Sequence, residues 1–224
     1  MNLFPDVFFL PSVEKRYGEG RFWDRRVMIL GGSTHCKRAM LESWGDRYQD
    51  CIHTGHCLQI RRPGCCGYIH SNRDGFVHSV PRYVVQLVAG IGKEQDISSE
   101  TQDDVWDSII STNYLQEALS DGQVRGTAAQ HHRSEAAFFE ELEAFRPELV
   151  ICFGVSDLWY KMPNVHFEPQ EAFSYQGITI QNGISAIASS EVRALPLWMP
   201  HPSAREAVDP VFWHGMIMEF CTTH

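Results

Sequence analysis

The sequence predicts an α/β protein with a three-layer α/β/α fold and a short, mostly parallel central sheet. Four short segments have the composition of buried strands, at residues 26–32, 108–113, 148–154 and 194–199. Helical patterns separate these segments, and strands that alternate with helices form parallel sheets that are covered on both faces. No internal repeat, linker or low-complexity segment divides the chain, so we expect one domain over residues 1–224.

Helices are expected near residues 37–41, 81–91, 103–107, 134–145, 156–160 and 205–221. The segment 134–145 has the strongest helical pattern. Ser134 is placed to cap it, and Pro147 lies just beyond its end. Four apolar residues recur at helical spacing and predict its buried stripe: Ala137, Phe138, Leu142 and Phe145.

Two further segments lack the pattern of a buried strand or helix. Residues 51–74 are rich in Gly, Cys, His and Arg without periodicity, which predicts a loop or an insertion. Residues 173–184 contain Gln176-Gly177 and Asn182-Gly183, two pairs that favour turns between strands. We therefore expect a β-excursion there.

Composition places the chain among ordinary globular proteins, with 43% hydrophobic and 21% charged residues in 224. No apolar run approaches the roughly 20 residues of a membrane helix, and no basic segment precedes the first apolar stretch as in a signal peptide. The seven cysteines are an odd number and fit reduced thiols better than a disulfide framework. We therefore expect a cytoplasmic protein without a membrane partner.

Charge is distributed unevenly along the chain. The net charge is −9, but residues 1–93 hold 13 Lys and Arg against 8 Asp and Glu. An acidic chain binds a polyanion poorly as a whole, whereas a basic first part can form a local positive face. Charge alone therefore neither indicates nor excludes a nucleic-acid partner.

Polar, small or glycine residues follow all four predicted strands. These strand ends carry Gly31-Gly32-Ser33-Thr34-His35, then Asn113-Tyr114, then Gly154-Val155-Ser156, and finally His201-Pro202-Ser203. Ligands of open parallel sheets bind where the carboxyl ends of the strands release their loops. The sequence therefore predicts one site at this edge. The alternative for each segment is an ordinary turn, strand end or helix cap.

In these segments the chain resembles the uracil-DNA glycosylase superfamily. The resemblance rests on the Gly-initiated first motif, on Asn113 at the end of a mid-chain strand, and on a late strand that leads into His201-Pro202-Ser203. It implies the three-layer fold, a pocket for one base, and hydrolysis of the bond between a deaminated or damaged base and its deoxyribose. DNA or another nucleobase-containing ligand would then be the partner.

The resemblance also implies roles for individual residues. His201 matches the histidine that stabilises negative charge on the departing base, and Asn113 matches the residue that binds the base edge. Pro202 and Ser203 would lie near a phosphate, with Gly31, Gly32 and Gly154 lining the pocket. Tyr114 is a candidate for stacking on the base.

The first motif departs from the family's pattern. No carboxylate or amide lies between Gly31 and Cys36, so Ser33, Thr34 or His35 would have to hold the attacking water. This departure keeps a second hypothesis open, in which a protein of the same fold binds a nucleobase or nucleic acid without hydrolysis.

A cluster of Cys and His residues supports a third hypothesis, a metal-dependent or redox protein. Seven such residues fall between positions 51 and 70, and Cys36, Cys51, Cys57 and Cys65 together could hold zinc or an iron–sulfur cluster. No Cys-x2-Cys pair is present, and we favour the interpretation that the protein needs no cofactor.

Overall fold

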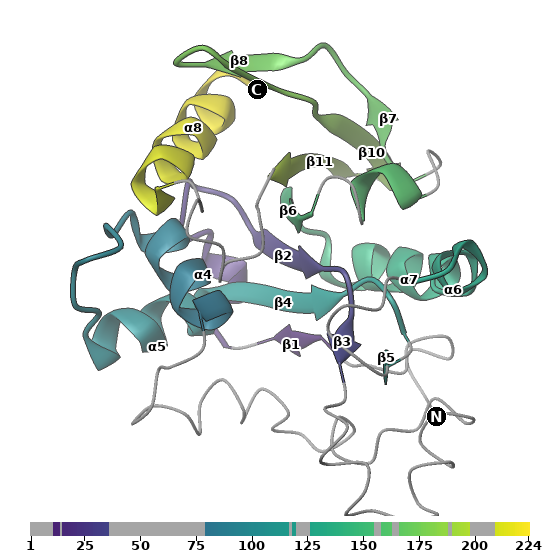
Figure 1. Ribbon diagram of the computed structural model, residues 1–224, viewed down its shortest axis with the longest axis horizontal. Coiled ribbons are helices and arrows are strands. Elements are labelled where there is room, and N and C mark those ends of the chain that lie inside the picture. The colour runs from purple at the N-terminus through teal and green to yellow at the C-terminus, as the bar shows by residue number, and fades with distance from the viewer. Residues whose placement is uncertain are drawn as a thin grey trace, which may run out of the picture.

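The computed structural model describes residues 11–13, 15–35, 79–116, 118–119, 126–154, 158–162, 166–187, 190–197 and 209–224 (Figure 1). The helix expected near residues 37–41 and the loop expected at 51–74 lie outside these ranges. Within them, no helix is both long and apolar enough to span a membrane.

A sheet of seven strands forms the centre of the described part, in the order β1-β4-β2-β6-β11-β10-β7. Its four central strands are parallel: β4 (Ile109–Asn113), β2 (Val27–Gly31), β6 (Leu149–Phe153) and β11 (Ser190–Leu197). Its outer strands are antiparallel to their neighbours: β1 (Ser12–Val13), β10 (Gly183–Ile187) and β7 (Glu168–Pro169). The predicted α/β fold with a mostly parallel central sheet is confirmed.

Three of the central strands form where the sequence predicts them, and β11 begins at Ser190 rather than at 194. The strands form because their side chains are largely buried on both faces. Residues Val27, Met28, Ile29 and Leu30 are all buried in β2. Successive side chains alternate between the two faces, so Val27 and Ile29 join one cluster of the core while Met28 and Leu30 join the other. The sheet therefore separates two hydrophobic layers.

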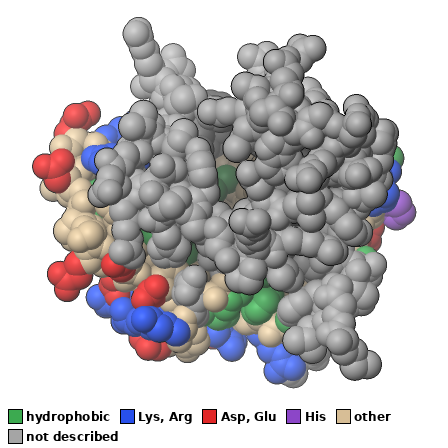
Figure 2. Space-filling view, turned by 90° about the horizontal axis from the view of Figure 1, so that it is seen from below, with side chains coloured by type: hydrophobic (Ala, Val, Ile, Leu, Met, Phe, Trp, Pro, Cys, Tyr) green, Lys and Arg blue, Asp and Glu red, His purple; other side chains and the backbone are tan. Residues whose placement is uncertain are grey.

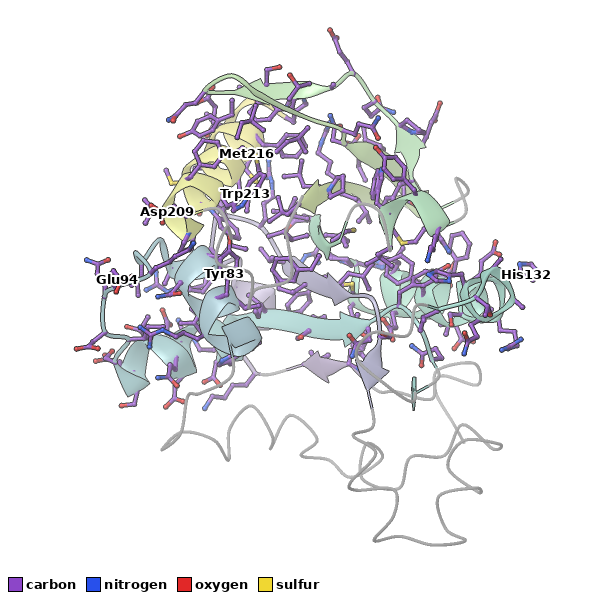
Figure 3. All side chains as sticks on the ribbon, viewed as in Figure 1. Tyr83, Glu94, His132, Asp209, Trp213 and Met216 are labelled. Atoms are coloured by element: carbon purple, nitrogen blue, oxygen red, sulfur yellow. The ribbon has the colours of Figure 1, made fainter. Side chains whose placement is uncertain are left out.

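Three helices cover one face, which we call the α8 face. They are α4 (Ser79–Ala89), α5 (Ser99–Ser108) and α8 (Pro210–Thr223). Trp213 and Met216 point from α8 toward the sheet (Figure 3) and are fully buried. Asp209 caps α8 by accepting a hydrogen bond from the Val211 backbone N–H at 3.1 Å. The predicted C-terminal helix is therefore present, although its described part begins at 210 rather than 205.

The opposite face, which we call the α7 face, is covered by α6 (Ala128–Arg133) and α7 (Glu135–Phe145). Ala137, Phe138 and Leu142 are buried as expected. The expectation that the Ser134 side chain caps α7 is wrong, because it makes no hydrogen bond to the first turn of that helix. The Ser134 hydroxyl instead accepts a hydrogen bond from the Gln116 backbone N–H and donates one to the Gln130 carbonyl. Because Ser134 lies between the end of α6 and the start of α7, its side chain joins the two helices to the chain after β4.

The segment between β6 and β11 contains the predicted β-excursion. It comprises the 3-10 helix η2 (Trp159–Lys161), β7, the hairpin β8 (Phe173–Tyr175) and β9 (Ile178–Ile180), and β10. Gln176 and Gly177 have φ of 45° and 82°, which is the left-handed conformation of a tight hairpin turn. Gly183, in contrast, opens β10 rather than forming a turn. The short helix expected at 156–160 begins later, at Trp159, and residues 155–157 are outside the described part.

Three short elements complete the described chain. The 3-10 helix η1 (Tyr17–Glu19) follows β1, and β3 (Thr34–His35) pairs in parallel with β5 (Ala118–Leu119). Strands of two residues carry no periodic pattern, so the sequence did not predict β1, β3, β5 or β7.

Candidate functional site at the carboxyl edge of the sheet

The ends of the four parallel strands lie in one row. Cα partners join Gly31 of β2 to Asn113 of β4, and Phe153 of β6 to Leu197 of β11. Leu30 pairs with Cys152, which places Gly31 and Phe153 at the same level. The arrows of β2 and β4 end on the same side in Figure 1. Three of the four predicted segments thus begin at one edge of the sheet.

The neighbouring strands β2 and β4 send their connections to opposite faces. The chain leaving β2 reaches α4 and α5 on the α8 face, whereas the chain leaving β4 reaches α6 and α7 on the α7 face. Ligands of open α/β sheets bind outside the strand ends where the strand order reverses, which in this order is between β2 and β6. Gly31 is the last residue of β2 at this position, and Asn113 is its Cα partner on the other side, at the end of β4.

The side chain of Asn113 lies against the backbone of Gly31. A Cβ atom added at Gly31 would be 2.5 Å from Asn113 Oδ1, closer than real Cβ atoms approach an oxygen. Gly31 is therefore required by the position of the amide group rather than by backbone conformation. Both residues are half-buried, so the amide lies at the edge of the sheet and not in its core.

Backbone hydrogen bonds hold the first motif and the chain after β4 side by side. The Tyr114 N–H donates to the Gly31 carbonyl at 2.8 Å, and the Leu115 N–H donates to the Gly32 carbonyl at 3.0 Å. The pairing of β3 with β5 continues this contact. Gly31, Gly32 and Asn113 are thus brought together, and Ser33, Thr34 and His35 follow directly. The side chains of Thr34 and His35 are outside the described part.

Tyr114 points away from this edge, into the α7 face. Its side chain is fully buried, its hydroxyl is hydrogen-bonded to His166 Nε2 at 3.1 Å, and its ring packs edge-on against Phe138. In this position no face of the ring is open for stacking on a base, so the structure gives Tyr114 a place in the core instead.

Gly154 ends β6 with a φ of 112°, a conformation that L side chains rarely adopt. Its carbonyl accepts a hydrogen bond from the Trp159 N–H at 3.1 Å, and its N–H donates to the Leu197 carbonyl at 3.4 Å. The glycine therefore turns the chain sharply at the third strand end and links it to the fourth.

Several predicted residues lie outside the described part. They include His201, Pro202 and Ser203, as well as Cys36, Cys51, Cys57 and Cys65 with the rest of the 51–70 cluster. In the residues that are described, no three His, Cys, Asp or Glu side chains are grouped so that they could hold a metal ion.

Buried polar groups lie behind β4 on the α7 face, and sequence reasoning missed two of them. Glu141 accepts a hydrogen bond from the Thr112 hydroxyl at 3.2 Å, and His166 contacts Phe139 as well as Tyr114. Burial raises the pKa of Glu141 to about 8 and lowers that of His166 to about 4. The signal for Glu141 was its position between Phe138 and Leu142, inside the apolar stripe of the helix.

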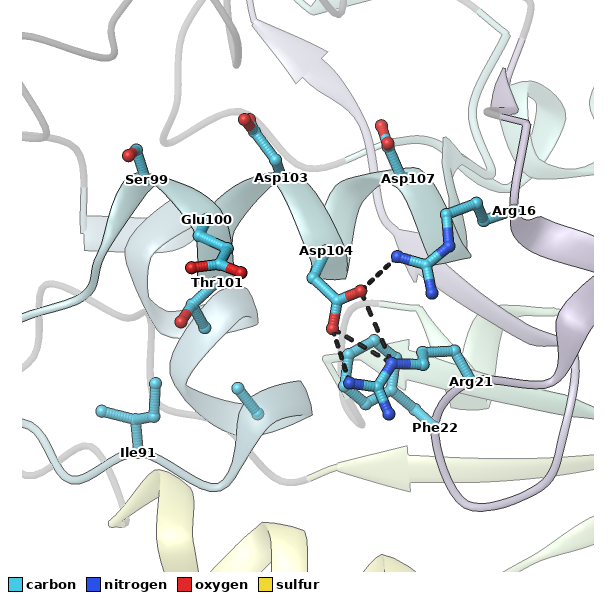
Figure 4. A pocket seen from close by; sticks show the side chains of 11 residues that line it. Arg16, Arg21, Phe22, Ile91, Ser99, Glu100, Thr101, Asp103, Asp104 and Asp107 are labelled. Atoms are coloured by element: carbon cyan, nitrogen blue, oxygen red, sulfur yellow. Dashed lines mark hydrogen bonds and ion pairs between the residues drawn. The ribbon is translucent and has the colours of Figure 1, made fainter.

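A hollow of about 800 Å³ lies at the opposite edge of the sheet, where α5 meets the segment before β2 (Figure 4). Asp104 forms ion pairs there with both Arg16 and Arg21, and Asp107 lies 3.7 Å from Lys15. Seen from below, acidic and basic side chains lie next to each other on the described surface (Figure 2). The hollow is thus separate from the carboxyl edge, and ion pairs neutralise part of its charge.

The chain matches no protein-family model and no curated protein sequence. The geometry of the carboxyl edge is therefore the basis for a proposal about function.

Proposed function

We propose that the protein binds a nucleobase at the carboxyl edge of β2 and β4 and hydrolyses the N-glycosidic bond of a deaminated or damaged base. The observation that carries this proposal is the Asn113 side chain, held against Gly31 at the carboxyl ends of two paired parallel strands. An amide offers one donor and one acceptor direction, which complements the edge of a uracil-like base. The resemblance to the uracil-DNA glycosylase superfamily supports the same assignment.

The proposed reaction breaks the bond between the base and C1′ of the sugar, and the bonding electrons leave with the base. His201 follows the last residue of β11 by four positions and would donate a hydrogen bond to the carbonyl oxygen on which the charge develops. Water then attacks C1′, and the proton that it releases neutralises the anion of the departed base. Ser33 and His35, directly after the paired glycines, are the residues proposed to hold that water.

DNA is the proposed substrate polymer. A base inside a duplex would have to be extruded before the edge of the sheet could bind it. The excess of basic residues over positions 1–93 supports contact with phosphates, although the whole chain has a net charge of −9.

A second candidate function is binding of a nucleobase or nucleic acid without hydrolysis. It is favoured by the absence of any carboxylate or amide side chain between Gly31 and Cys36. A hydroxyl is a much weaker base than a carboxylate, so Ser33 or Thr34 would activate water less strongly than an acidic residue at the same place.

The test is base release from single- and double-stranded oligonucleotides that contain uracil, hypoxanthine or xanthine. We expect the wild-type protein to release one of these bases faster than the others. His201→Ala should lower the rate of release by about 10²–10³-fold. Asn113→Ala should abolish the preference for one base over the others. Gly31→Ala should lower base binding because its methyl group displaces the Asn113 amide. Gly18→Ala is the matched control, since Gly18 has open space around it and lies far from the edge.

The outcomes separate the two candidates. Binding of the oligonucleotides that depends on Asn113, without release of any base, supports the second function. Neither binding nor release by folded protein contradicts both.

A further inference from the structure

A buried carboxyl group packs against the strand that carries Asn113. Glu141 of α7 has no exposed surface, and its Oε1 accepts the hydrogen bond from Thr112. Its Oε2 is buried without a hydrogen-bond partner among the described residues. Thr112 directly precedes Asn113 in β4 and is paired with Leu30. One side chain of α7 therefore holds the strand residue next to the proposed base-binding amide.

Glu141 is neutral at pH 7 in this environment. No Lys, Arg or His among the described residues forms an ion pair with it, and a buried carboxylate with one hydrogen bond is unfavourable. Burial raises its pKa from 4.5 to about 8; the hydrogen bond from Thr112 opposes this shift, and the charge of Glu140 adds to it.

Three other titratable groups on this face, Tyr114, Cys152 and His166, supply no compensating positive charge at pH 7. Burial raises the pKa values of Tyr114, after β4, and Cys152, on β6, so both remain neutral. Burial lowers the pKa of His166 to about 4, so this ring is also neutral. His131 of α6 is hydrogen-bonded through Nδ1 to the Thr127 carbonyl.

We propose that Glu141 is a positioning residue that, in its protonated form, holds the end of β4 and couples the Gly31–Asn113 site to pH. When Glu141 ionises, the buried anion favours an arrangement in which α7 gives it access to water. Because Thr112 donates more strongly to a carboxylate than to a carboxyl group, this movement of α7 displaces the end of β4 with it. The predicted effect of pH on base binding rests on the proposed function. The coupling between Glu141 and Asn113 does not, because it needs no ligand.

The coupling can be tested by NMR without any ligand. We expect the side-chain amide of Asn113 and the backbone amides of Tyr114 and Leu115 to shift with a midpoint near pH 8 in the wild-type protein. Glu141→Gln keeps a neutral side chain of the same shape and should abolish this transition. Glu143→Gln is the matched control on the exposed side of α7 and should retain it.

A second variant, Thr112→Val, separates the ionisation of Glu141 from its effect on Asn113. It remains informative if Glu141→Gln does not fold. In Thr112→Val the backbone amide of Leu142 should still report ionisation of Glu141, whereas the Asn113 side chain should no longer follow it. Absence of a transition at Asn113 in the wild-type protein overturns the proposal. The proposal is also overturned if the transition at Asn113 persists unchanged in Glu141→Gln, or if it persists in Thr112→Val.

Failure of the proposed function gives a different result. If the oligonucleotides are neither bound nor cleaved while Asn113 still titrates near pH 8, the coupling stands and the ligand is wrong. If base release occurs and its pH profile is the same in Glu141→Gln, the function stands and the coupling fails.

Discussion

The side chains that α4 and α8 bury against the sheet are mostly apolar, whereas those behind α6 and α7 include many polar groups. Among the described residues, Gln86 of α4 and Ser108 of α5 are buried polar residues on the α8 face, and Gln86 donates to the backbone carbonyls of Gly92 and Lys93. The α7 face buries six polar side chains that surround the end of β4: Thr112, Gln116, His131, Ser134, Glu141 and His166.

This difference indicates where the fold is specialised. Burying polar groups is unfavourable unless they are hydrogen-bonded, so a core built for stability alone uses few of them. Networks of such groups instead fix one arrangement of the chain, and they occur where a particular geometry is needed. Here they hold residues 112–116, which continue directly from the strand end that carries Asn113.

The largest expected effect concerns the apolar face. Trp213 of α8 is buried within the hydrophobic cluster, and Trp213→Ala should lower the free energy of unfolding by about 4 kcal/mol. Because the Trp213 side chain does not titrate and the cluster around it consists of apolar residues, the loss should be equal at pH 5 and pH 8 in urea unfolding. A loss that differs between the two pH values would contradict the separation of the two faces.

The α7 face should instead respond to acid through His166. Its pKa is lowered from 6.5 to about 4 in the folded protein, so unfolding takes up a proton at low pH. The stability present above pH 6.5 should therefore be lost progressively as pH falls through 4, by about 3 kcal/mol in total. His166→Phe fits the surrounding aromatic rings and should flatten this acid limb. Urea unfolding at several pH values measures the effect, and an unchanged slope in the variant would contradict it.

Tyr114→Phe should have a smaller effect on the same face. The variant keeps the ring contacts with Phe138 but leaves His166 Nε2 without its hydrogen bond. The expected loss is about 1–2 kcal/mol in the free energy of unfolding at pH 7. Tyr175→Phe on the hairpin is a control, since Tyr175 is half-buried and outside this network. Equal losses in the two variants would argue against a specialised polar face.

Most of the fold could be predicted because its central strands are short, continuous and largely apolar. The bounds of β2 and β6 agree with the sequence to within about a residue. The location of Gly31 and Asn113 at one edge also follows from sequence, because parallel strands end at the same edge, whereas their direct pairing is shown only by the structure. The close contact of the Asn113 amide with Gly31 could not be predicted from the sequence, because a Gly-Gly pair is equally typical of a turn.

The less successful predictions have identifiable causes. Tyr114 was expected beside the base because it follows Asn113, but side chains alternate along a strand, and Thr112 and Tyr114 share the opposite face. Glu141 was missed because the buried stripe of α7 was defined from apolar residues alone. The role of His201 remains a prediction, because it lies outside the described residues.

The smallest expected effect concerns the charged surface beyond the α8 face, around the hollow. Asp104 bridges Arg16 and Arg21, which attaches the segment after β1 to α5. These arginines are substantially exposed to water, so salt screens the interaction and its contribution to stability is small. Asp104→Asn should therefore change the unfolding midpoint less than Tyr114→Phe, and the difference from wild type should disappear as ionic strength rises. Thermal unfolding at low and high salt measures it. A large, salt-independent loss would mean that Asp104 belongs to a buried network, as on the α7 face, and the distinction between the two faces would have to be redrawn.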